Sequence, residues 1–261
     1  MGVDMKQLSA FTKKEFLEQI RTGKLLLLGI IFCLFGIMNP AIAKLTPWMM
    51  EILSSQLAES GMIVTEVRVN DMTSWTQFFK NMPMVLIIFI VMFSGCLTTE
   101  YQKGTLLNMI TKGMKRWKII ASKTAVIMVL WVAGCLLSFG ITLGYNAYFW
   151  GNDTVQNIEA AAGFFCLFGL WILAALIMAS ALCRQTFAVI LGTGAAYLGA
   201  YLIGMFPPFK PYSPSCLLDS AGLLTGANSA GDYLWAVFIT ILLMFIQGVV
   251  AIIAFNRKTC L

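Results

Sequence analysis

Six apolar runs, each 18 to 26 residues long, dominate this chain, and none of them contains an Asp, Glu, Lys or Arg. A helix needs about 20 mainly apolar residues to cross about 30 Å of hydrocarbon, so each run is long enough to span a membrane. Charged residues make up 11% of the 261 residues, against about 25% in a soluble domain. The sequence therefore predicts an all-α integral membrane protein with a single transmembrane domain over residues 1–261. The predicted spans are Leu25–Ala43, Met82–Thr99, Thr124–Phe149, Ala160–Leu182, Phe187–Met205 and Tyr233–Phe255.

The positive charges predict how these spans are oriented, because loops rich in Lys and Arg stay in the cytoplasm. With both termini inside, 14 of the 18 Lys and Arg residues lie on inner segments, whereas eight of the 12 Asp and Glu residues lie outside. The net charge of +6 is therefore a topology signal and does not indicate a nucleic-acid partner. We expect a multi-pass protein of the bacterial cytoplasmic membrane, in contact with membrane lipid, with both termini in the cytoplasm.

The chain lacks the residues on which most membrane enzymes depend. It has no histidine, no G-x-x-x-x-G-K-[ST] motif for nucleotide phosphates and no C-x-x-C pair. Ionisable residues inside spans mark proton relays and ion-coupled transporters, and the predicted spans have none. We expect no catalytic, cofactor or metal site in this chain, and its energy must come from elsewhere.

Residues 5–24 predict an amphipathic helix that lies along the inner membrane surface. Its apolar face comprises Met5, Leu8, Phe11, Phe16 and Ile20, and its basic face comprises Lys6, Lys13, Lys14, Arg21 and Lys24. Glu15 is the one charge on the apolar side. The helix either sets the orientation of the first span or also touches a cytosolic partner.

The inner segment 100–123 is the most informative stretch between spans. Thr105 is suited to cap a short helix and Gly113 to end it. Leu106, Leu107 and Ile110 then form a small apolar face. An apolar face of this kind is unfavourable in water unless it is buried, either against a protein partner or against the membrane surface.

Two outer segments are also distinctive. Residues 44–81 form a long extracellular loop, with helical stretches at Trp48–Leu57 and Trp75–Phe79 and a strand-like alternation at Ile63–Val69. Residues 206–232 are too apolar for a free loop, and they predict a re-entrant element that contains a short helix at Cys216–Leu224.

Small and sulfur-bearing side chains suggest where subunits meet. The fifth span is rich in small residues that permit close helix approach. In the second span, Met84, Ile88, Met92 and Cys96 follow one another at i+4 spacing and therefore share one face of the helix. We expect these faces to line a dimer interface or a substrate path, with packing inside one subunit as the alternative. The residues are Met84, Ile88, Met92, Gly192, Gly199 and Gly204.

The motif Glu100-x-x-x-Gly104-Thr105-Leu106, followed by Lys112-x-x-x-Arg116 and by Lys123 at the third span, resembles the ABC-2 type permease family. The resemblance extends over the whole chain in layout, from the amphipathic helix to the long outer segment before the sixth span. It implies a half-transporter that forms a homo- or heterodimer with a second permease subunit and docks two cytosolic ATPase subunits. Those ATPases, and not this chain, would bind ATP and Mg.

By this resemblance, residues 104–112 are the coupling helix and residues 5–24 the connecting helix. The residues that would couple to the ATPase are Glu100, Gly104, Thr105, Leu106, Leu107, Ile110, Lys112 and Arg116. Loop 44–81 is long and resembles subfamilies that export antimicrobial or cytolytic peptides, including the phenol-soluble-modulin exporters. The predicted function is export of an amphipathic peptide or hydrophobic drug. Two alternatives remain, a non-transport membrane subunit of a sensor or assembly complex and a membrane-embedded enzyme.

Overall fold

The computed structural model describes residues 2–58, 69–104, 111, 114–151 and 154–257. Within these ranges the regular structure is entirely helical, and six helices are long and apolar enough to cross a membrane. The predicted fold class is confirmed. The six are α2 (Lys24–Ala58), α3 (Asp71–Phe93), α6 (Arg116–Phe149), α7 (Ile158–Leu182), α8 (Thr186–Gly204) and α10 (Leu234–Arg257).

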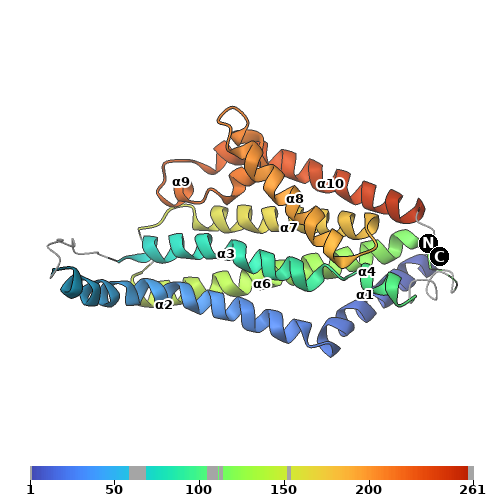
Figure 1. Cartoon of the computed structure of the whole chain (residues 1–261), viewed down its shortest axis with the longest axis horizontal. Coiled ribbons are helices and arrows are strands. Elements are labelled where there is room, and N and C mark those ends of the chain that lie inside the picture. The colour runs from blue at the N-terminus through green and yellow to red at the C-terminus, as the bar shows by residue number, and fades with distance from the viewer. Residues whose placement is uncertain (1, 59–68, 105–110, 112–113, 152–153, 258–261) are drawn as a thin grey trace.

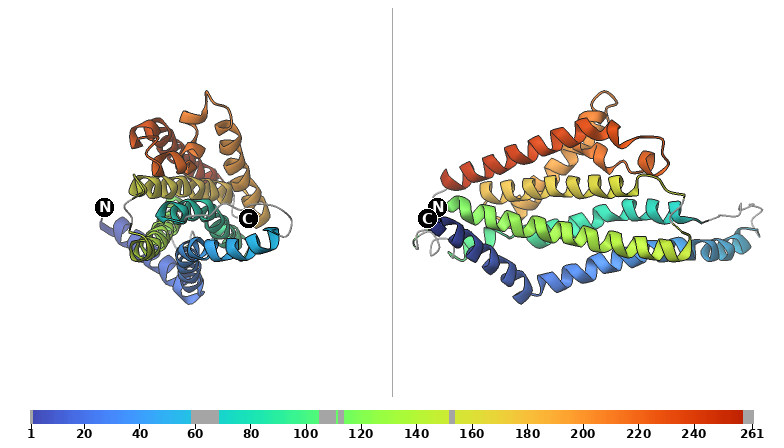
Figure 2. Two further views of the ribbon diagram at one scale, coloured as in Figure 1. Left: turned by 90° about the vertical axis from the view of Figure 1, so that its left-hand side faces the viewer. Right: turned by 180° about the vertical axis from the view of Figure 1, so that it is seen from behind.

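Helix α7 is the centre of the bundle. In its most apolar stretch 72% of residues are buried, against 17% in α8 and 22% in α10, which lie at the periphery. Helices α3 and α6 pack on one side of α7, with α2 against them, and helices α8 and α10 pack on the other side (Figures 1 and 2). The start of α1 (Gly2–Arg21) and the end of α10 lie at the same end of the bundle, which we call the inner end because the sequence predicts both termini in the cytoplasm.

Trp131 of α6 holds four helices together. Its ring lies 5.9 Å from Phe32 of α2, 5.3 Å from Phe89 of α3 and 5.9 Å from Phe165 of α7. Two glycines make room for this cluster, because a Cβ at Gly134 would clash with Phe32 and one at Gly169 with Trp131. Small residues at helix contacts are the expected means of close packing in lipid.

Helix α2 continues through Pro40, beyond the predicted end of the first span at Ala43. Proline leaves the carbonyl four residues earlier without its helical donor. The Thr142 hydroxyl of α6 supplies the missing donor to Gly36 O at 2.9 Å. Neighbouring helices commonly satisfy such groups in membrane proteins, and here the contact allows α2 to extend to Ala58.

The extracellular loop predicted at 44–81 is therefore much shorter than expected. Helix α2 takes up its first part, and α3 begins at Asp71, so the stretches predicted as separate short helices belong to the two long ones. Most of the predicted strand-like alternation, residues 59–68, lies outside the described residues.

A sharp elbow separates α1 from α2 at Thr22-Gly23, where Gly23 has a φ of 71° that favours glycine. The predicted amphipathic helix is present, but its predicted apolar face is divided. Phe11 packs into the core, whereas Phe16 and Ile20 are exposed. Glu15 is buried together with Phe11.

The outer segment 206–232 is a series of short turns at the outer end of the bundle (Figure 1). The single helix predicted at Cys216–Leu224 is wrong, because the backbone breaks at Asp219-Ser220. Leu217 and Leu223 are buried, and Tyr233 stacks on Phe164 of α7. The turns are η1 (Lys210–Tyr212), η2 (Pro214–Leu218), α9 (Ala221–Leu224) and η3 (Ala230–Tyr233).

Candidate coupling site at the inner end

The sequence predicted that the second span continues as one helix to Thr99, but in the structure this helix is interrupted. Helix α3 ends at Phe93, and a turn leads into the short helix α4 (Thr98–Gln102). Lys24 at the start of α2 donates to Met92 O at 3.3 Å, and its ammonium lies 5.3 Å from the Phe93 ring. A cation at the end of α3 compensates for carbonyls that the helix leaves open. This break places Glu100 of α4 beside the start of α6.

Lys123 of α6 joins two segments that are distant in sequence. Its Nζ lies 2.7 Å from Glu15 Oε2 of α1 and 3.0 Å from Glu100 Oε1 of α4. The side chains of Lys123 and Glu15 are only 6% and 3% exposed, and that of Glu100 is 13% exposed. A buried charge is costly unless it is paired, so each of these groups requires the others. We call Glu15, Lys123 and Glu100 the inner junction.

A second, more exposed pair extends the inner junction along α1. Lys14 Nζ lies 2.8 Å from Glu18 Oε2 and 3.1 Å from Glu15 Oε1. Burial acts against the charged form of Lys14, but the carboxylates of Glu18 and Glu15 outweigh it and raise the pKa of Lys14. Burial likewise acts against the Glu18 carboxylate, but the Lys14 ammonium outweighs it and lowers the pKa of Glu18.

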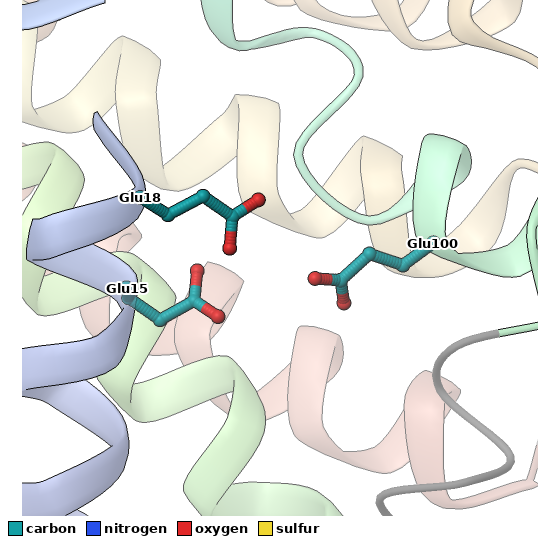
Figure 3. A group of neighbouring side chains, drawn as sticks. All are labelled: Glu15, Glu18 and Glu100. Carbon is teal, nitrogen blue, oxygen red and sulfur yellow. The ribbon is translucent and has the colours of Figure 1, made fainter. Parts of the chain in front are cut away.

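Three carboxylates converge at this point, two from α1 and one from α4 (Figure 3). One oxygen each of Glu15, Glu18 and Glu100 lies within 4.8 Å of the other two. Oxygen ligands of this kind suit hard divalent cations. However, the ammonium groups of Lys14 and Lys123 already lie at ion-pair distance from these carboxylates. The lysines thus supply the positive charge that the cluster needs.

A cavity of about 740 Å³ opens beside the inner junction. Its wall includes Lys24 and Lys103 as well as the charged residues of the inner junction. Thr99, Glu100 and Lys103 bring the α4 region to this wall, so the cavity lies directly beside the short helix.

A second contact ties α1 to α6 next to the inner junction. Lys118 is 1% exposed and donates to Gln7 Oε1 at 2.9 Å. One turn further along α6, the Thr12 hydroxyl of α1 donates to Ser122 Oγ at 3.1 Å. Helix α1 is therefore held against the start of α6 by polar contacts and does not rest on lipid alone.

The structure places only some of the predicted coupling residues. Gly104 ends the α4 region with a φ of 66°. Arg116 donates to Phe255 O and Asn256 O at the end of α10, and this contact joins the start of α6 to the end of α10. The other predicted coupling residues, Thr105, Leu106, Leu107, Ile110 and Lys112, lie outside the described residues.

The residues predicted to line a dimer interface or path have mixed environments. Met84 and Gly192 are exposed, whereas Ile88 and Met92 are half-buried within the subunit. The exposed ridge of α3 is formed by Met84, Ile87 and Val91, which differs from the predicted i+4 stripe. On α8, Gly199 has open space where a side chain would be, but a Cβ at Gly204 would clash with Ser215, so Gly204 serves packing inside the subunit.

The sequence reasoning missed the roles of Glu15 and Lys118. The signal for Glu15 was present, since it is the one charge on the apolar side of the amphipathic helix. A carboxylate in that position needs a buried cation, but its partner Lys123 lies 108 residues away in the chain.

Comparisons with known proteins agree with this architecture. Residues 10–209 match the model of the ABC-2 family transporter protein. The chain is also 22% identical to an uncharacterized transmembrane protein, YxlG, of Bacillus subtilis (strain 168), over 97% of this chain and 98% of the relative. The family comprises membrane subunits of transporters that are not themselves catalytic, and membership implies an ABC ATPase as partner. With its six membrane-spanning helices, this chain is a multi-pass cell-membrane protein that belongs to the ABC-2 family of transporter permeases.

Proposed function

We propose that this chain is the permease subunit of an ATP-driven exporter and that the inner junction transmits the movement of a separate ATPase to the spans. The observation that carries the proposal is the position of Lys123, which pairs with Glu15 of α1 and Glu100 of α4 at once. Helices α4 and α6 flank residues 104–112 in the chain, which form the segment that would meet the ATPase. A displacement of α4 therefore acts on α1 and α6 together.

The sequence of events follows from this linkage. Two cytosolic ATPase subunits, which bind ATP and Mg, would dock on residues 104–112 of two permease subunits. Burial of the apolar face of Leu106, Leu107 and Ile110 would hold each ATPase, at about 1.5–3 kcal/mol for each side chain before ordering costs. Closure of the ATPase pair would then push α4, and the buried ion pairs would transfer the push to the spans.

The proposed substrate is an amphipathic peptide, cytolytic or antimicrobial, or a hydrophobic drug. Exposed apolar side chains on α3 and α8, including Met84, Val91 and Leu198, offer surfaces that suit such molecules. A substrate already in the inner leaflet would enter sideways between two subunits, along a path near Met92 and Gly199.

The test is reconstitution of the purified chain with the ATPase encoded beside it. We expect a complex with two copies of each subunit and ATP hydrolysis that depends on the permease. Leu107→Asp combined with Ile110→Asp should abolish association while membrane insertion is retained. The matched control is Tyr148→Asp, since Tyr148 is an exposed side chain at the outer end of α6, far from the inner end.

Two results would overturn the proposal. One is wild-type association and hydrolysis in the double variant. The other is a stable complex with a neighbouring sensor or assembly protein and no ATPase, which would support the non-transport alternative.

A further inference from the structure

A second cavity lies between α3, α6 and α7, in the half of the bundle near the outer end. Its volume is about 280 Å³, and it is lined mainly by apolar side chains. Helices α6 and α7 run side by side, with α3 behind them (Figure 2). The inner junction contributes no residue to this cavity, and nothing in the coupling scheme uses it.

Three phenylalanines, one from each helix, form the walls of this cavity. They are Phe78 of α3, Phe139 of α6 and Phe165 of α7. Trp75 packs against two of these rings, since its ring centroid lies 5.6 Å from that of Phe78 and 5.2 Å from that of Phe139. The faces of aromatic rings carry partial negative charge, and sites lined by several such rings are known to bind quaternary ammonium ions.

A single carboxylate stands at the outer edge of the cavity. Glu159, in the first turn of α7, lines the cavity and is exposed. It forms no ion pair with any residue that the structure describes. Its negative charge thus borders an apolar space, without an ion-pair partner in the part of the chain that the structure describes.

The entrance faces the surface that would meet lipid. Leu136 at the edge is 65% exposed, and Gly163 is exposed with open space where a Cβ would be. A molecule dissolved in the membrane can therefore reach the cavity from the side, without passing through the inner end.

We propose that this cavity binds a small organic cation with an apolar body, of the quaternary ammonium class. The apolar body fills the space between the three phenylalanines, and the cationic head lies between the ring faces and the Glu159 carboxylate. The site belongs to one subunit, and the assignment does not depend on how the chain couples to an ATPase.

Binding is measured with the purified chain in phosphatidylcholine nanodiscs, without an ATPase. The probe is benzyltrimethylammonium, and neopentylbenzene, in which carbon replaces the nitrogen, is the neutral match. Ligand-observed NMR reports binding of each, with empty nanodiscs as background. We expect saturable binding of the cation that exceeds binding of the neutral match.

Two variants and one control test the assignment. Glu159→Gln should weaken binding of the cation about tenfold, as expected for a lost contact to a charged group, and leave the neutral probe unchanged. Gly163→Leu should fill the entrance and reduce binding of both probes. Glu51→Gln removes another exposed carboxylate, on the outer part of α2, and should change neither.

The proposal is overturned if Glu159→Gln binds the cation as tightly as the unmodified chain. It is overturned equally if Glu51→Gln weakens binding as much as Glu159→Gln, because the effect is then one of surface charge. If both probes bind the Gly163→Leu variant as tightly as the unmodified chain, and its unfolding temperature is unaltered, then the probes bind at another place and the proposal is overturned. Because no ATPase is present, these outcomes are independent of the proposed coupling.

Discussion

The two ends of this bundle are held together by different chemistry. At the inner end, helices α1, α4 and α6 meet through buried ion pairs around Lys123. At the outer end, α2, α3 and α6 meet through neutral hydrogen bonds, such as Asn81 Nδ2 to Asn39 Oδ1 at 2.7 Å and Ser74 Oγ to Asn146 Oδ1 at 2.7 Å.

The difference has a mechanical meaning. A buried ion pair depends strongly on geometry, and losing one partner is costly. A neutral hydrogen bond contributes less and its loss has local effects. We therefore expect substitutions at the inner end to alter coupling, and substitutions at the outer end to alter stability alone.

The largest effect should come from Lys123→Met. This change leaves Glu15 and Glu100 buried without their shared cation, which costs about 3–5 kcal/mol in typical buried pairs. The free energy of unfolding, measured in detergent micelles, should fall by this amount. Adding Glu15→Gln and Glu100→Gln to the same chain should recover much of the loss, because the inner junction then holds no unpaired buried charge. A triple variant less stable than Lys123→Met would contradict the ion-pair account.

Glu15→Gln alone should have a smaller effect that is concentrated in α1. Lys123 keeps Glu100, but α1 loses its charged contact with α6, at a cost of about 1.5–3 kcal/mol. Hydrogen exchange along residues 8–20 should become faster. Glu18→Gln is the control, since the Glu18 side chain is 44% exposed and pairs with Lys14. Equal acceleration in both variants would show that Glu15 has no special role.

Thr142→Val tests the outer end. It removes the hydroxyl that donates to Gly36 O near Pro40, and an unsatisfied buried carbonyl costs about 1–3 kcal/mol. Stability should fall, while ATP hydrolysis per folded complex stays at the level of the unmodified chain. If ATP hydrolysis falls by more than the amount of folded protein does, then the outer end also affects coupling, and the expected difference between the two ends is contradicted.

The smallest effect concerns Lys210 and Asp219 in the outer segment, whose charged atoms lie 2.8 Å apart. The hydrogen bond and charge of Asp219 raise the pKa of Lys210 above 10.5. A raised lysine pKa gives stability that is complete below the ordinary value and is lost as pH rises through the folded value. The pair is exposed, so the contribution is at most about 1 kcal/mol.

The measurement for this pair is the unfolding temperature between about pH 8 and pH 11.5, for the unmodified chain and for Lys210→Met. The difference between them should shrink as pH rises. A constant difference would mean that the ion pair contributes no measurable stability.

The sequence predicted the elements that lipid requires and missed those that depend on distant partners. Six spans follow from apolar runs alone, because every spanning helix must be apolar over its length. The continuation of α2 past Pro40 depends on Thr142, and the pairing of Glu15 depends on Lys123, both more than 100 residues away. No proline marks the helix break after Phe93 in the sequence. The break is accompanied by a contact from Lys24, distant in the chain, which donates to Met92 O at the end of α3.

The central claim is that the inner junction couples the ATPase to the spans, and Glu100→Gln tests it most directly. The measurement is permease-dependent ATP hydrolysis per assembled complex in proteoliposomes, for the unmodified chain, Glu100→Gln and Thr142→Val. The account predicts that Glu100→Gln assembles with the ATPase but loses most of this hydrolysis, while Thr142→Val retains it. Hydrolysis at the unmodified level in assembled Glu100→Gln complexes would contradict the account.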